Sequence, residues 1–330
     1  MPDFPWTPGS ATGVGSLPGT DVAEAQRVVF GELPDLPHLV ELPARGPGAD
    51  LIGRSAGFLV DLPVQVYAGR WQVAPRPGKD LRRTADLLER DLDQLTEQGD
   101  RYAGPLKLQS AGPWTLAASI DRQIGGGLLR DPGAVRDLTD SLAEGLRRHV
   151  DEVRKRLPRA EVLLQIDEPS LPAVLAGRVP TESGLSAYRA IPEPDAASAL
   201  RVIAEAVGVP VIAHCCASDV PLGVFRAARA AAVALDLSLI KDLDPLGEAL
   251  EARLGLFAGA APTTLPARGI DAKAVASRVS TLWKRLAFPA AQLPRQVVIT
   301  PACGLAGASP DDARAVLTAC REAARRLSEV

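Results

Sequence analysis

The residues best suited to metal chemistry lie in the segment VIAHCCASD. His214 and Cys216 are two positions apart at the end of a predicted strand, so both side chains point to the same face, while Cys215 points to the other. Imidazole and thiolate are preferred ligands of zinc. Cys303, in TPACGLAG, and Asp236 each end another predicted strand and can supply a third and a fourth ligand. The alternative is a set of buried structural cysteines beside a core histidine.

An acidic pair ends another apolar run, in the segment QIDEPSL. Asp167 and Glu168 follow the predicted strand Val162–Ile166. A buried carboxylate is costly unless it meets a partner, so this position favours binding of a cation such as a substrate amine. The alternative is that Asp167 caps the following turn.

The glycine-rich segment ATGVGSLPG precedes the first predicted helix. Its glycines allow close approach of the backbone, and N–H groups near Ser16 could hold a carboxylate or a phosphate. A dinucleotide site requires G-x-G-x-x-G, and here Gly19 comes one residue too late after Gly13 and Gly15. The segment therefore favours a small anion over a dinucleotide.

The other two histidines are expected to have no chemical role. His149 lies in RRHVDEVRKR, where we expect it on a solvated helix face. His38 begins a strand, away from the expected active end, and is expected to be structural.

These side chains need a scaffold that brings strand ends together. Short apolar runs alternate with loops and amphipathic stretches, which is typical of β/α units around a parallel sheet. We expect eight strands, at Thr12–Gly15, His38–Glu41, Leu106–Gln109, Val162–Ile166, Val211–Ala213, Val233–Leu235, Leu254–Ala258 and Val297–Thr300. We expect helices at Asp80–Gln98, Gly133–Leu157, Ala196–Val207, Pro221–Ala230, Leu246–Leu254, Asp271–Leu286 and Pro310–Leu327.

Eight strands interleaved with helices predict an α/β fold, a single (β/α)8 TIM barrel over residues 1–330. The alternative is an open doubly wound sheet. The barrel is favoured because candidate side chains end at least five separate strands, whereas an open sheet would gather them at one switch point. Two Pro- and Gly-rich insertions, Ala44–Lys79 after strand two and Glu168–Pro194 after strand four, could form a lid over the active face.

Composition excludes several classes of protein. In 330 residues, 37 Lys and Arg face 40 Asp and Glu, so the basic excess of a nucleic-acid-binding protein is missing. Four cysteines, two of them adjacent, are no disulfide framework and fit reduced thiols in a cytoplasm. No signal peptide and no uncharged apolar stretch long enough to span a membrane is visible.

The motifs GVGSLPG, QIDEP, AHCC and PACGL together resemble the cobalamin-independent methionine synthase family, within a larger group of barrels that includes uroporphyrinogen decarboxylase. The resemblance covers most of the chain and corresponds to the catalytic C-terminal barrel of that family. It implies a zinc ion held, in chain order, by His214, Cys216, Asp236 and Cys303.

The resemblance also implies a site for the amino-acid end of homocysteine. Asp167 matches the residue that holds the amino group, and Ser16 matches the one at the carboxylate. Glu41, in VELPARG, matches a second acidic residue near the amine with a shift of register. The segment Phe257–Pro262, FAGAAP, has no histidine where the family has a catalytic one, and GPWTLAASI differs from the segment that lines the folate site.

We therefore expect a zinc-dependent methyltransferase that activates a small thiol, converting homocysteine to methionine with methyl-folate or a methyl-corrinoid as donor. One alternative is a thiol alkyltransferase that uses another thiol or a corrinoid-linked donor. A second is a non-catalytic barrel that binds zinc or an amino acid. A third is a metal-free, decarboxylase-like barrel for an anionic tetrapyrrole.

Overall fold

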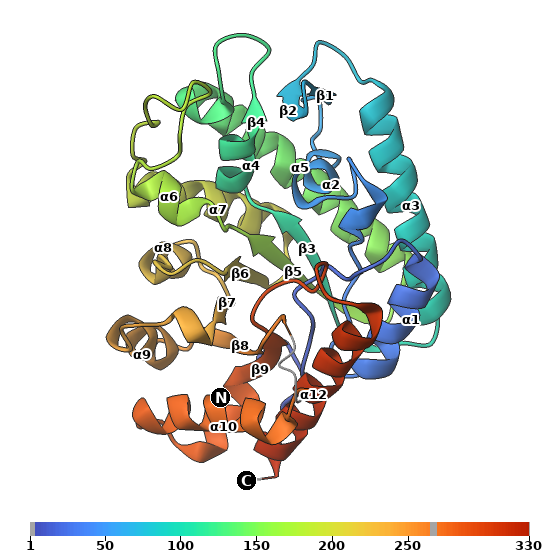
Figure 1. The fold of residues 1–330 in the computed structure, drawn as a ribbon, viewed down its shortest axis with the longest axis vertical. Coiled ribbons are helices and arrows are strands. Elements are labelled where there is room, and N and C mark those ends of the chain that lie inside the picture. Colours follow the sequence, from blue (N-terminus) through green and yellow to red (C-terminus); the bar gives the residue numbers. More distant parts are fainter. Residues whose placement is uncertain (1–3, 265–268, 330) are drawn as a thin grey trace.

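A curled parallel sheet lies at the centre of the computed structural model, which describes residues 4–264 and 269–329 (Figure 1). Its six strands follow one another in chain order, each hydrogen-bonded to the next. They are β3 (Gly104–Ala111), β5 (Ala160–Asp167), β6 (Val211–Cys215), β7 (Ala232–Asp236), β8 (Gly255–Ala261) and β9 (Val297–Pro301). All six were predicted, and the parallel order places their carboxyl ends at one edge of the sheet.

The first two predicted strands are reduced to isolated bridges. These bridges are parallel and connect the two outer strands of the sheet through the N-terminal segments: Ala11 with Ile299, Ser16 with Glu41, and His38 with Lys107. The edge strands β9 and β3 are thereby linked, and the fold is an α/β fold of TIM-barrel-like form.

Glycines account for the irregular course of the first segment. A Cβ atom at Gly13 would lie 2.3 Å from His38 Nε2, and one at Gly15 would lie 3.0 Å from Gln109 Cγ. Side chains from neighbouring segments thus fill the space beside this backbone. Glycine in a strand commonly marks such a close approach and weakens regular pairing.

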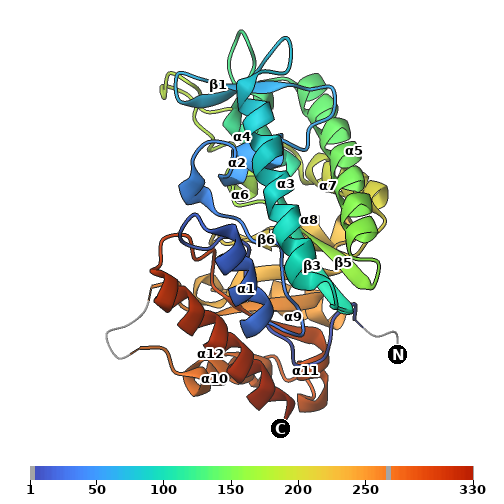
Figure 2. The same cartoon turned by 90° about the vertical axis from the view of Figure 1, so that its right-hand side faces the viewer.

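Helices pack around the outside of the sheet (Figures 1 and 2). The long ones are α1 (Val22–Glu32), α3 (Lys79–Gly99), α5 (Pro132–Arg156), α7 (Glu193–Val207), α10 (Ala272–Arg285) and α12 (Pro310–Ser328). The short ones are α2 (Leu51–Ala56), α4 (Pro113–Ser119), α6 (Leu171–Leu175), α8 (Leu222–Ala227), α9 (Asp244–Glu251) and α11 (Leu293–Gln296). None of the described helices is long and apolar enough to cross a membrane.

The helix starts follow their capping residues. The Asp131 carboxylate accepts a hydrogen bond from Gly133 N at 2.8 Å, with Pro132 in the first position of α5. Ser309 Oγ accepts one from Asp312 N at 3.1 Å at the start of α12. All seven predicted helices are present, whereas α1, α2, α4, α6 and α11 were not predicted.

A second, three-stranded sheet lies at the end of the molecule opposite to α10 and α12 (Figures 1 and 2). It consists of β1 (Val64–Tyr67), β2 (Arg70–Val73) and β4 (Ile120–Asp121). Residues 44–79, predicted as an insertion, contain α2, β1 and β2, and residues 168–194 contain α6.

The inner face of the large sheet changes from apolar to polar toward its carboxyl edge. At the amino end, a separate apolar cluster contains Leu163 of β5, Ile212 of β6 and Phe257 of β8, with the Trp6 ring packed edge-on against Phe257. Two residues further along their strands, on the same face, come Gln165 and His214. This apolar base supports a polar upper layer, and the candidate site lies there.

Candidate metal centre

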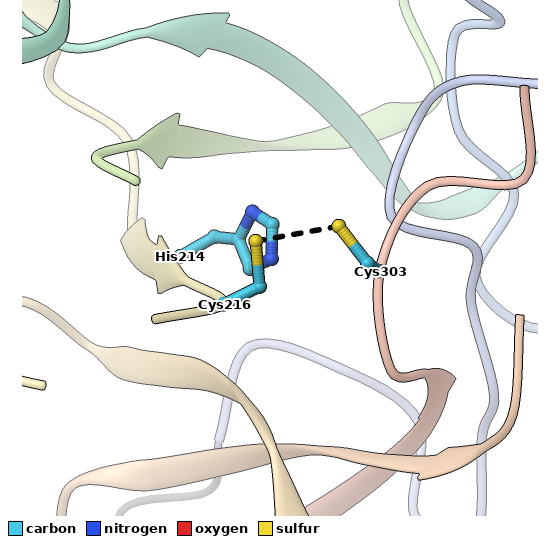
Figure 3. Close-up of side chains that lie close together, drawn as sticks. All are labelled: His214, Cys216 and Cys303. Atoms are coloured by element: carbon cyan, nitrogen blue, oxygen red, sulfur yellow. Dashed lines mark hydrogen bonds between the residues drawn. The ribbon is translucent and has the colours of Figure 1, made fainter. Parts of the chain in front are cut away.

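Three predicted metal ligands converge at the carboxyl edge of the sheet. His214 and Cys216 come from the end of β6, and Cys303 comes from the loop after β9. One ligand atom from each lies within 4.8 Å of the other two, and the two sulfurs are 3.3 Å apart (Figure 3). The parity of β6 places His214 and Cys216 on one face, as predicted, because successive side chains alternate across a strand.

The His214 ring is held from behind by a carboxylate. Its Nδ1 lies 2.6 Å from Asp167 Oδ1, which also accepts a hydrogen bond from Gln165 Nε2 at 2.7 Å. His214 Nε2 is buried and has no hydrogen-bond partner among the described residues. A proton on Nδ1, donated to Asp167, leaves the Nε2 lone pair free for a metal ion, which is the usual carboxylate–histidine–metal arrangement.

The two thiols differ in acidity. The contact with Cys303 and burial raise the pKa of Cys216, whereas the contact with Cys216 and the proximity of His214 lower the pKa of Cys303 to about 6. One thiolate therefore forms readily at neutral pH. A metal cation would stabilise both sulfurs as thiolates.

The three side chains fit a zinc ion. Zinc takes thiolate and imidazole ligands at about 2.3 and 2.0 Å in tetrahedral sites, and a group spanning 4.8 Å matches that size. The unpartnered His214 Nε2 supplies the nitrogen donor.

The fourth predicted ligand, Asp236, is placed differently. Its Oδ1 accepts hydrogen bonds from Ser238 N at 2.8 Å and from Ser238 Oγ at 2.7 Å, so it caps the short 3-10 turn Leu237–Leu239. It is not part of the His214–Cys216–Cys303 group. The structure thus brings together three of the four predicted ligands.

The predicted substrate residues lie beside the group. Ser16 and Glu41 form a parallel bridge, and Ser16 O accepts a hydrogen bond from Leu305 N at 2.9 Å, two residues beyond Cys303. Glu41 is 6 % exposed. Burial raises the pKa of Glu41 to about 7, with Arg54 opposing the rise and nearby Asp167 adding to it.

A buried lysine that was not predicted lies near these carboxylates. Lys107 of β3 is fully buried, and its Nζ donates to Val14 O at 2.9 Å. Burial lowers the pKa of Lys107 to about 8, while the nearby Asp167 and Glu41 carboxylates oppose that fall. A single lysine inside the apolar run PLKL was the available signal, because such a residue is rarely buried without a charged neighbour.

The second acid of QIDEP has a structural role. Glu168 accepts hydrogen bonds from Trp114 N, Thr115 N and Thr115 Oγ1 at 3.0, 2.8 and 2.7 Å. It therefore caps the first turn of α4 and fixes that helix to the end of β5. Burial raises the pKa of Glu168 to about 7, although these hydrogen bonds oppose the rise.

The expectation for His149 was wrong. His149 is 5 % exposed, and its ring lies 4.6 Å from that of Phe58. Burial and the nearby Arg54 lower the pKa of His149 to about 3, so the ring is neutral. His38 is fully buried, in keeping with its expected structural place.

Comparison with known proteins places this geometry in a family. Residues 9–326 match the family model described as the catalytic domain of cobalamin-independent synthase. The chain belongs to the cobalamin-independent synthase family. It is a methyltransferase of that family, and the match spans almost the whole chain, including every residue of the His214–Cys216–Cys303 group.

Solved structures share the fold of this cobalamin-independent synthase family member. A B12-independent methionine synthase from Shewanella sp. W3-18-1, in complex with selenomethionine, is 13 % identical, with a TM-score of 0.63 and 98 % of each chain covered. A methyltransferase from Methanosarcina mazei is 15 % identical, with a TM-score of 0.58, covering 98 % of this chain and 94 % of that one. No curated protein sequence matches the chain.

Gly304 provides a test of how Ser16 is placed in this family member. A Cβ at Gly304 would lie 2.1 Å from Ser16 Oγ, so Gly304→Ala is expected to turn the Ser16 hydroxyl away. Because Ser16 is predicted to hold the carboxylate of homocysteine, we expect the affinity for homocysteine to fall about tenfold, the cost of losing one hydrogen bond to a charged group, with zinc content unchanged. Calorimetric titration and metal analysis measure the two effects. Gly307→Ala is the matched control, because nothing lies within 4 Å of its Cβ position; equal affinities in the two variants would contradict the role of Ser16.

Proposed function

We propose that this family member is a zinc-dependent methyltransferase that activates a small thiol, with homocysteine as the acceptor and methionine as the product. The observation that carries the proposal is the His214–Cys216–Cys303 group, with a buried histidine nitrogen left free and Asp167 behind the ring. The family match and the predicted substrate residues beside this group support it.

His214, Cys216 and Cys303 would hold the zinc ion. Zinc held there would lower the pKa of a substrate thiol from about 8.5, so that the sulfur would be a nucleophilic thiolate at neutral pH. Asp236 is proposed as an exchangeable fourth ligand; its Oδ1 accepts two hydrogen bonds from Ser238 in this structure.

The amino-acid end of the substrate would be held by Ser16, Asp167 and Glu41. Asp167 uses Oδ1 for His214 and Gln165, and no described residue donates to its Oδ2. That oxygen and the Glu41 carboxylate are available to a substrate ammonium, and Ser16 is available to the carboxylate. Binding the amine and carboxylate orients the sulfur before methyl transfer.

A corrinoid-linked methyl donor is the second candidate. Two observations support it, both at segments that differ from those of the folate-dependent family members. The segment of β8 at Phe257–Pro262 carries no histidine. Trp114 is 3 % exposed, and its Nε1 donates to Ala196 O at 3.1 Å, so the indole is packed against α7 instead of forming a surface for a pterin.

We propose further that one (β/α)8 barrel comprises residues 1–330, with residues 44–79 and 168–194 bordering its active face. Residues 44–79 contribute Arg54, whose Nε lies 3.5 Å from Glu41 Oε1, so this segment is joined to the proposed substrate site. This contact places the segment next to the site that a lid would cover.

The experiment begins with zinc analysis of the purified protein, followed by homocysteine titration of the cobalt-substituted form. About one zinc per chain and an increase in the sulfur-to-cobalt absorption band on adding homocysteine, beyond the band that Cys216 and Cys303 already give, support thiol activation. Turnover with methyl-folate or methylcobalamin then identifies the donor. Zinc and thiol binding without turnover by either donor indicate a non-catalytic barrel, and absence of metal after anaerobic reconstitution refutes the proposal.

A further inference from the structure

A buried arginine lies behind one of the carboxylates proposed for the substrate ammonium. The Arg54 side chain, in α2, is 2 % exposed, and its Nε lies 3.5 Å from Glu41 Oε1. Its Nη1 donates to Asp91 Oδ2 at 2.6 Å. On the other side, Arg45 holds Asp91 through both terminal nitrogens, at 2.7 and 2.9 Å. Glu41 thus ends a buried series of alternating charges that runs from α3 to the site.

The groups around Glu41 shift the pKa of its carboxyl group in opposite directions. Burial and Asp167 raise the pKa of Glu41, while Arg54, Lys107 and a hydrogen bond from Gln109 lower it. Of the groups that lower the pKa of Glu41, Arg54 has the largest effect. Arg54 in turn faces Asp91, Glu41 and the neutral ring of His149. Of the groups that keep Glu41 ionised, Arg54 alone forms a salt bridge with it.

Glu41 and Arg54 both have buried polar atoms without hydrogen-bond partners, and such an atom on Glu41 can bind a ligand. Glu41 Oε1 is buried without a hydrogen-bond partner among the described residues, and so are Arg54 Nε and Nη2. The Nε–Oε1 distance of 3.5 Å is long for a hydrogen bond, so the arginine supplies charge while leaving lone pairs on the carboxylate. A hydrogen-bond donor of the substrate can use those lone pairs.

We propose that Arg54 is a positioning residue that holds Glu41 as a carboxylate facing the site, and that it thereby makes the site selective for thiols carrying an ammonium group. This inference rests on the proposed function. Arg54 does not touch the substrate, because Glu41 lies between them. Replacing Arg54 is therefore expected to change the affinity for thiols that carry an amine, and not the affinity for thiols that lack one.

The experiment compares homocysteine with 4-mercaptobutanoate, which is homocysteine without its amino group. Dissociation constants are measured by calorimetry on the zinc-loaded protein, for the wild type and for Arg54→Met. We expect the preference for homocysteine to fall at least about tenfold in Arg54→Met, the equivalent of one unit of carboxyl pKa. Affinity for 4-mercaptobutanoate is expected to change less than about threefold, within the usual effect of a distant substitution.

The pH profile distinguishes ionisation from a merely structural role. The ratio of the two affinities cancels the titration of the thiol. In the wild type this ratio is expected to rise as the pH passes through about 7, where Glu41 loses its proton. In Arg54→Met the rise is expected at higher pH. Arg54→Lys keeps the charge but cannot engage both carboxylates as a guanidinium does, so partial recovery of the preference is expected.

Arg45→Met is the matched control. It also removes a buried partner of Asp91, but among the described residues Arg45 forms its ion pair with Asp91 and none with Glu41. Urea unfolding of each variant shows how much stability is lost, and Arg54→Lys provides the comparison if Arg54→Met does not fold. Loss of the preference in Arg54→Met but not in Arg45→Met supports the inference.

Three outcomes overturn it. An unchanged preference in Arg54→Met and Arg54→Lys refutes the inference and leaves the proposed function standing, as does an equal loss in Arg45→Met. Failure of both thiols to bind the wild type refutes the proposed function, and the inference with it.

Discussion

Cys216→Ser and Cys303→Ser variants are each expected to lose at least about nine-tenths of the zinc found in the wild type. Both sulfurs belong to the three-residue group, and a hydroxyl at either position replaces a soft thiolate by a group that stays protonated and binds zinc weakly. Methyl transfer is expected to fall by about a thousandfold or more, because removal of a metal that activates the nucleophile costs several kcal/mol. Metal analysis and thiol-methylation assays measure these losses.

Cys215→Ala is the control for this pair. Cys215 is adjacent to Cys216 but faces the other side of β6, where it is fully buried in the apolar core. Burial raises the pKa of Cys215 to about 12, so it remains a thiol. The variant is expected to be less stable but to retain zinc. Retention of zinc in both Cys216→Ser and Cys303→Ser would show that the group is not a metal site.

The metal group was predictable because it depends on strand parity and on the common edge of a parallel sheet. His214 and Cys216 needed only an alternating strand, and Cys303 needed only a barrel-like order of strands. The position of the Asp236 side chain depends instead on local hydrogen bonds, which strand order does not determine. A carboxylate two residues before Ser238 can cap the turn or reach toward the site, and strand order does not distinguish the two.

The wrong expectation for His149 has a different cause. The sequence around it is strongly polar, but His149 lies three residues after Leu146 and four before Val153, both fully buried. The helical period therefore places it on the buried stripe of α5. The polar composition of the segment indicates a solvated face, whereas the helical period indicates the buried one, and the structure follows the period.

The support behind Glu41 could not be predicted from the sequence. Arg54 and Asp91 are 37 positions apart, and Asp91 lies in a helix where charged residues are common. Their pairing depends on how α2 packs against α3, which no local pattern encodes. Lys107 is similar, because its neighbours Asp167 and Glu41 come from other parts of the chain.

Asp167→Asn is expected to retain zinc but to bind homocysteine at least about thirtyfold more weakly, because the loss of one partner in a buried charge pair costs about 2 kcal/mol or more. The asparagine oxygen can still accept a hydrogen bond from His214 Nδ1, as Asp167 Oδ1 does at 2.6 Å. Its amide nitrogen then replaces Oδ2 and presents donors to the substrate ammonium. Because the partner behind the histidine is weakened, zinc affinity is expected to fall by about 10–100-fold.

Competition with a chelator measures the zinc affinity of Asp167→Asn, and titration with homocysteine and 4-mercaptobutanoate separates the two roles of the carboxylate. The amine-free thiol is expected to lose little affinity, since it does not need Oδ2. Glu168→Gln is the control, because Glu168 carries a neighbouring carboxylate that is committed to capping α4. It is expected to lose stability and to keep its preference for homocysteine.

If Asp167→Asn loses zinc altogether, the carboxylate serves the metal site alone; if it binds both thiols as the wild type does, the proposed amine contact is wrong. A selective loss of homocysteine binding would mean that one aspartate both orients the metal-binding histidine and holds the substrate amine, with each task on its own oxygen.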